Sequence, residues 1–170
     1  MAAPTAGPTE GEGMMDSILY ERDFHAWALE QASALRKLAE ERVNLPLDLP
    51  HLIEEVEDMA NNELDVVEGN LTQVILHLLK LEWSAEVEPR RHWMVETASF
   101  RANALRRLKR SPTVQGRIDL SGIYADAREQ FVALRPDLAA TVPETSAYSV
   151  DQLLQRGWCP INRHGISDNN

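Results

Sequence analysis

The sequence has one cysteine, no strand pattern and no long apolar run. Cys159 alone excludes an internal disulfide bond and a cysteine-rich zinc site. No stretch of about four to eight residues alternates between β-branched or aromatic and polar side chains, as half-buried strands do. No segment approaches the roughly 20 apolar residues that a membrane-spanning helix needs. These absences predict an all-α, cytoplasmic protein without a membrane partner.

The common motifs of catalytic sites are also missing. There is no Gly-x-Ser-x-Gly, no glycine loop for phosphate and no His-Glu-x-x-His. A di-iron bundle needs Glu-x-x-His pairs on two helices, and the chain has none. We therefore expect no resident metal and no cofactor, and whether the protein is an enzyme stays open.

The composition divides the chain into three parts. The start, MAAPTAGPTEGEGMM, is rich in Pro, Gly, Thr and Glu and lacks the basic and apolar regions of a secretory signal. We expect residues 1–15 to be a disordered tail, residues 16–160 to form a single helical domain, and residues 161–170 to be a flexible tail. A chain of 170 residues is long enough to bury one sizeable core.

Helical periodicity dominates the central part. Asp48 is expected to cap the second helix, and Ser149 with Gln152 has the form of a capping box. Ser111 is expected to cap the short turn that begins with Pro112. The prediction is an all-α bundle of about four main helices with a short C-terminal helix. The expected segments are 17–43, 51–83, 90–110, 119–134 and 150–156.

The second predicted helix has a long apolar stripe and should form the centre of the domain. At 100° per residue, eight apolar side chains fall within about 60° of the direction of Ile53. They are Val56, Ala60, Leu64, Val67, Leu71, Val74, Ile75 and Leu78.

Charge is distributed unevenly along the chain, whose net charge is −10. Residues 1–88 contain 19 acidic and 5 basic side chains, whereas residues 89–110 contain 7 basic and 1 acidic. The candidate contact surface on this basic segment comprises Arg101, Arg106, Arg107, Lys109 and Arg110. It is expected to pack against the acidic second helix, in this chain or in another copy. Binding of nucleic acid is the less favoured alternative, because the whole chain is acidic.

The acidic stretch LIEEVEDMANNE divides into outer and inner carboxylates. Glu54, Glu55 and Asp58 point away from the stripe, and the helix dipole favours negative charge in a first turn. We interpret these three as a solvated face, with a ligand or partner site as the alternative. His51 lies on the same outer side.

Four polar residues form a candidate cluster: Asp23, Glu57, Glu63 and His77. Glu57 falls inside the apolar stripe, and Glu63 and His77 lie along one edge of it. A carboxylate on a core-facing stripe needs hydrogen bonds, a cation or a proton. Two interpretations remain open, a structural polar seam between helices and a functional site.

Several segments resemble a bacterial family, the domain of unknown function DUF29. They are LYERDFHAWALEQASALR at 19–36, DLPHLIEEVEDMANNE at 48–63, LTQVILHLLKLEW at 71–83, and YADAREQF at 124–131. The chain has Leu81 where family members commonly have Trp. The resemblance implies a helical fold and brings no established activity, substrate or cofactor. The family's pattern falls on Asp23, Trp27, Glu54, Glu55, Glu57, Met59, His77 and Lys80.

Two hypotheses for function follow. The first is a non-enzymatic protein-interaction module that binds a protein partner or forms a homo-oligomer. The second is a small enzyme or metal-binding protein that uses Asp23, Glu57, Glu63 and His77. The second requires these side chains to meet in one pocket open to solvent.

Overall fold

The computed structural model describes residues 18–41 and 45–167, and within these ranges the fold is all-α with no strand. Residues 18–22 are also helical. Four main helices and the short C-terminal helix agree with the predicted fold class. The elements are α2 (Phe24–Glu40), α3 (Leu49–Trp83), α4 (Arg90–Arg110), the 3-10 helix η1 (Pro112–Arg117), α5 (Leu120–Leu134), the 3-10 helix η2 (Pro136–Leu138) and α6 (Val150–Leu154).

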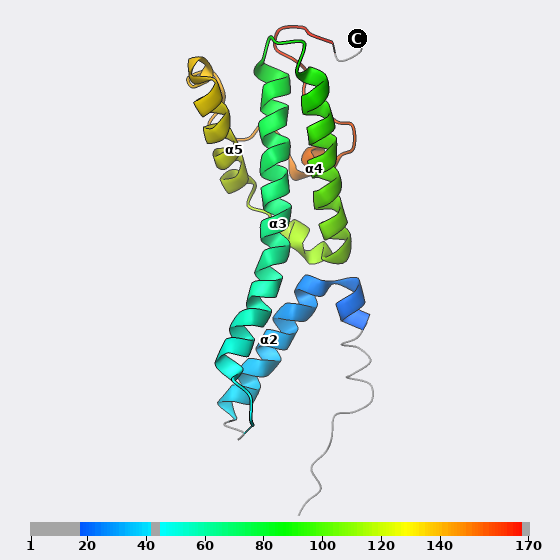
Figure 1. Ribbon diagram of the computed structural model, residues 1–170, viewed down its shortest axis with the longest axis vertical. Helices are drawn as coiled ribbons and strands as arrows, with labels where there is room; N and C mark the ends of the chain where they lie inside the picture. Colours follow the sequence, from blue (N-terminus) through cyan, green and yellow to red (C-terminus); the bar gives the residue numbers. More distant parts are fainter. Residues whose placement is uncertain (1–17, 42–44, 168–170) are drawn as a thin grey trace, which may run out of the picture.

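Helix α3 is the axis of the molecule (Figure 1). It packs against α2, α4, α5, η1 and α6. Asp48 caps its first turn, as predicted, and Pro50 lies in that turn. The helix continues through Gly69 to Trp83 without interruption.

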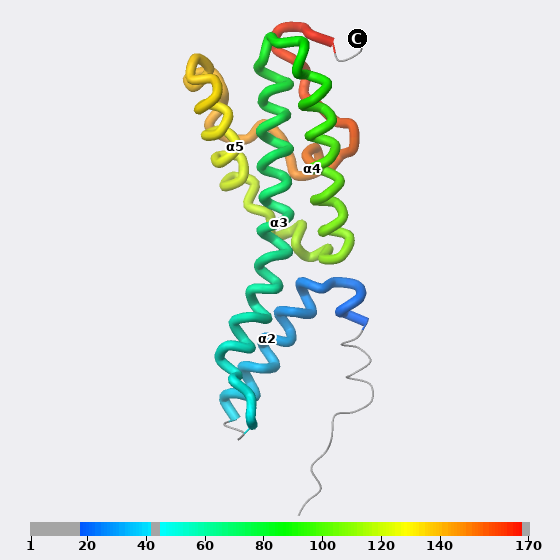
Figure 2. The backbone as a smooth tube through the Cα atoms, viewed as in Figure 1, coloured from blue at the N-terminus to red at the C-terminus, as the bar shows by residue number. Residues whose placement is uncertain are grey.

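The tube view separates two regions along α3 (Figure 2). We call α2 together with residues 49–63 the arm, and residues 64–167 the body. In the body, α4 and α5 lie on different sides of α3, whereas in the arm α2 is the one described helix beside it (Figure 1). The C-terminal segment lies at the end of the body farthest from the arm.

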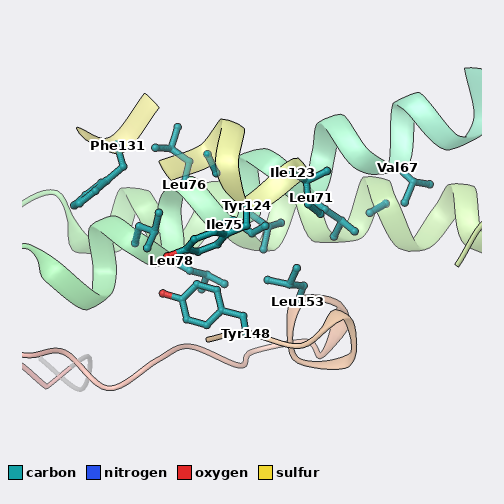
Figure 3. Packing of buried hydrophobic residues seen from close by; sticks show 14 of the residues in the cluster. Val67, Leu71, Ile75, Leu76, Leu78, Ile123, Tyr124, Phe131, Tyr148 and Leu153 are labelled. Carbon is teal, nitrogen blue, oxygen red and sulfur yellow. The ribbon is translucent and has the colours of Figure 1, made fainter. Parts of the chain in front are cut away.

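The main hydrophobic core lies in the body, where side chains from α3, α5 and the segment around Tyr148 meet (Figure 3). It begins at Val67 and contains no arm residue. The arm instead buries mainly small side chains, Ala28, Ala32 and Ala60, between α2 and α3, with the larger Phe24 and Leu49 buried at the first residues of the two helices. Small residues bring the two helix backbones close but remove little apolar area from water.

The predicted first helix is broken at Asp23, whose φ of −153° is not helical. The side chain of Asp23 caps α2 by accepting from the backbone N–H of Ala26 at 3.0 Å. Residue 17 and residues 42–43 of that prediction lie outside the described ranges, as do residues 1–15 of the expected tail. The capping box of Ser149 and Gln152 is present as predicted.

Two predictions on polar groups need correction. Ser111 lies at the N-cap position of η1, as predicted, but its side chain makes no cap hydrogen bond, because its hydroxyl donates to Glu63 instead. Residues 161–167 are not a loose tail. Asn162 is 5% exposed and donates to the carbonyls of Leu81 and Ser84 at 2.7 and 2.9 Å, so this segment is fastened to the end of α3.

Candidate functional site

The turn between α4 and η1 is the point where two of the four candidate polar residues, Asp23 and Glu63, come together. Asp23 is buried and accepts from the backbone N–H of Thr113 at 2.9 Å and from its hydroxyl at 3.1 Å. The α2 cap is thereby tied to a residue 90 positions further along the chain.

Glu63 lies under the same turn and is only 2% exposed. Its Oε1 accepts from Arg107 at 2.9 Å and from Arg110 at 3.4 Å, and its Oε2 accepts from the hydroxyl of Ser111 at 3.1 Å. The guanidinium of Arg110 also lies 4.0 Å from the centre of the Phe24 ring. The buried carboxylate is therefore paired by the basic end of α4, as charge complementarity between the two helices predicts.

His25 adds an imidazole to this junction, with its Nδ1 3.0 Å from the Thr113 hydroxyl. Burial, and then the positive charge of Arg117, lower the pKa of His25. In a nucleophilic triad the carboxylate orients the imidazole. Here Asp23 instead accepts from the Thr113 hydroxyl, the Thr113 backbone N–H and the Ala26 N–H at the start of α2. These hydrogen bonds fasten α2 to η1 and do not orient the imidazole of His25.

Glu57 and His77 lie apart from this junction. The side chain of Glu57 is 32% exposed and pairs with Arg36 on the surface between α2 and α3, so the prediction that the core hides it was wrong. His77 is buried beside Phe100 and hydrogen-bonds the Gln73 carbonyl at 2.7 Å through Nδ1. Burial lowers its pKa.

The enzyme or metal hypothesis needed these residues in one pocket. Fourteen residues of α3 separate Glu63 from His77, which corresponds to roughly 21 Å along the axis. Among the described residues, no three His, Cys, Asp or Glu side chains are grouped so that they could hold a metal ion. The four residues therefore do not form one site.

The outer carboxylates Glu54, Glu55 and Asp58 are exposed along the arm. Near them the imidazole of His51 lies 2.6 Å from the carboxylate of Asp48, and this hydrogen bond raises the pKa of His51. This side of the arm is an acidic, solvated face.

The basic segment splits between the interior and the surface. Arg101 is 3% exposed and donates to the carbonyls of Leu153 and Trp158 at 2.6 and 3.0 Å, so its assignment to a surface was wrong. Its guanidinium thereby links α4 to the end of α6 and to the segment that follows it. Lys109 is exposed, with its side chain outside the groove described next.

A groove of about 520 Å³ lies between α3 and the end of α4. Arg106 on its wall donates to Asn103 at 2.5 Å, while Arg107 and Arg110 both bond Glu63. Three guanidinium groups therefore border one hollow. Its lining residues are Val66, Asn70, Asn103, Arg106, Arg107 and Arg110.

A second buried polar group, missed from the sequence, lies at the far end of α3. Glu82 is 6% exposed, accepts from the Tyr148 hydroxyl, and pairs with Arg163 at 2.7 Å. Burial and the neighbouring Glu82 raise the pKa of Tyr148. Glu82 falls near 20° from Ile53 at 100° per residue, inside the apolar stripe, and that position was the available signal.

An exposed apolar row runs along the arm. Leu52 and Met59 are 39% and 44% exposed, and with Val66 they are spaced by seven residues on one flank of α3. In the body α4 covers this flank, because Val66 and Asn70 face Asn103 across the groove and His77 contacts Phe100. Beyond Glu63, among the residues that the structure describes, α4 no longer covers the row.

Comparison with known proteins gives a family and a structural relative. An alpha-helical protein of unknown function from Rhodospirillum rubrum is 28% identical, with a TM-score of 0.71 over 82% of this chain and 90% of that one. No curated protein matches the chain. In the described parts, no helix has the length and apolar character to cross a membrane. The model of the family named Domain of unknown function DUF29 matches residues 19–159, and the chain belongs to this family.

Proposed function

We propose that this protein is a non-enzymatic protein-interaction module of the cytoplasm and that the arm is its docking surface. The observation that supports this most directly is the row of Leu52 and Met59, exposed on the flank of α3 that α4 covers in the body. A helix buries its apolar stripe against another element. In the arm, α2 and α3 form a single layer. The flank of α3 with Leu52 and Met59 therefore has no described partner within the chain.

The charge of the arm indicates what chemistry its partner has. The residues of the arm, 24–40 and 49–63, contain 7 acidic and 2 basic side chains. Two arms brought together would repel each other, which disfavours arm-to-arm pairing of two copies. The partner that fits is an amphipathic helix of another protein, with apolar residues for Leu52 and Met59 and basic residues for Glu55 and Asp58.

Affinity capture with paired variants tests the docking surface. L52E/M59E places charge on the row, whereas V87E/I161E makes the same change at exposed positions of the body, at 63% and 90% exposure. A partner should be captured from a lysate of the source organism by the wild type and by V87E/I161E, and lost with L52E/M59E. Once purified, it should bind directly, and its affinity should fall as salt rises, because the contacts are partly ionic.

Sedimentation of the purified protein distinguishes the alternative occupant. Concentration-dependent dimerisation that L52E/M59E abolishes would assign the arm to a second copy. If the protein is a monomer and L52E/M59E loses no protein that the wild type captures, the arm has no interaction role. Circular dichroism of both variants checks that the helices are retained.

A further inference from the structure

We propose that the groove between α3 and α4 binds a small phosphorylated ligand, as a site separate from the arm. The groove holds about 520 Å³, within the range of roughly 300–1,000 Å³ typical of small-molecule sites. Val66 provides an apolar surface in it, and Asn70 and Asn103 provide amides. No carboxylate is among its lining residues.

The charge balance of the groove favours an anion. Arg106, Arg107 and Arg110 contribute three positive charges, and among the described residues the carboxylate that they contact is that of buried Glu63. Arg107 and Arg110 share a single oxygen of that carboxylate. Within the described part of the chain, two of these positive charges therefore have no paired carboxylate, although the net charge of the protein is −10. A dianion in the groove would neutralise them.

The arginines are held in position before any ligand arrives. Asn103 holds Arg106, Glu63 holds Arg107, and Glu63 together with the Phe24 ring holds Arg110. In the described contacts each guanidinium uses one nitrogen, and it has five N–H donors in a planar fork that matches phosphate oxygens. Prior ordering reduces the entropy that binding costs.

A small ligand fits this site better than a nucleic acid. Nucleic-acid surfaces neutralise a row of phosphates with an extended basic track. Here the three arginines are gathered within five residues of α4, and further along the arm α3 has the acidic residues Glu54, Glu55, Glu57 and Asp58. One phosphate or diphosphate group would reach all three guanidiniums, whereas a longer polyanion would meet the carboxylates of the arm.

Calorimetric titration with inorganic pyrophosphate tests the site, with sodium chloride at matched ionic strength as the reference. The variants are R106E, which reverses a charge in the groove, and K109E, which makes the same reversal on the same helix outside it. Arg106 is chosen because its described contact is with Asn103 and not with buried Glu63. We expect one site per chain, weakened at least about tenfold in R106E because charge-assisted hydrogen bonds are lost, and weakened less than about threefold in K109E.

Three results would overturn the assignment. They are absence of pyrophosphate binding at millimolar concentration, equal weakening by R106E and K109E, and tighter binding of duplex DNA that both variants reduce alike. Equal weakening would mean diffuse attraction to the basic end of α4. Pyrophosphate binding is independent of Leu52 and Met59, so L52E/M59E should retain it whether or not the arm binds a protein.

Discussion

At the scale of single residues, Glu57 and Glu63 show how neighbouring carboxylates on one helix can have different roles. Both were expected to face the interior. Glu63 does so, beneath a turn that supplies two guanidiniums and a hydroxyl. Glu57 meets Arg36 at the surface. The periodicity of α3 gives the direction of each side chain, but it does not show that α4 ends before it reaches Glu57.

Matched substitutions should separate these two roles. E63Q removes the charge that holds Arg107 and Arg110. Breaking a buried ion pair costs about 3–5 kcal/mol, and because both arginines are partly exposed we expect a smaller loss, about 2 kcal/mol, in the free energy of unfolding. E57Q weakens an exposed pair and should cost less than about 1 kcal/mol. Urea denaturation measures both, and equal costs would contradict the structural importance of the junction.

The lowered pKa of His77 predicts how stability depends on pH. Burial lowers its pKa in the folded protein below the ordinary value of 6.5. The unfolded chain therefore takes up the proton first as pH falls through about 6.5, so acidification favours unfolding. We expect the wild type to lose stability between about pH 7.5 and pH 5.5, and H77Q to lose less over the same interval. Urea midpoints at the two pH values measure this, and an undiminished loss in H77Q would assign the effect to other groups.

At the scale of elements, periodicity and caps were enough to predict α3, α4 and α5 closely. Asp48 and Ser149 cap the helices for which they were predicted. The break at Asp23 was missed because its causes include Thr113, a partner distant in sequence. The fastening of residues 161–167 was missed for the same reason, since their polar composition matches that of a tail. Long-range hydrogen bonds leave no local pattern.

Asn162 should contribute to stability despite its place near the end of the chain. Its amide satisfies carbonyls at the C-terminal end of α3, where helical partners are lacking. N162A removes the amide donor from both carbonyls. The Leu81 carbonyl keeps its hydrogen bond from Arg90 at 2.8 Å, so we expect a loss of about 1 kcal/mol in the free energy of unfolding. I161A, at a residue 90% exposed, should change it little. Equal stability of N162A and the wild type in chemical denaturation would show that the segment is not fastened.

At the scale of the whole molecule, one helix joins two regions of unequal packing. The body has helices on more than one side of α3 and contains the main core, with Leu71, Ile75 and Leu78 fully buried. Among the described residues, the arm has only α2 beside α3, buries mainly alanines with Phe24 and Leu49 at its helix starts, and has an acidic face. The sequence predicts the stripe that runs through both, but not where the covering helices end.

This difference predicts two levels of protection against hydrogen exchange. Local opening needs less free energy where fewer apolar groups are buried, so amides of residues 26–38 and 51–60 should exchange faster than those of residues 71–82. Exchange measured by mass spectrometry on the intact protein tests this. A partner bound to Leu52 and Met59 should slow exchange in the arm selectively, whereas pyrophosphate in the groove should act mainly on residues 103–110. Uniform protection along α3 would mean that the arm is as stable as the body and is not an incomplete layer.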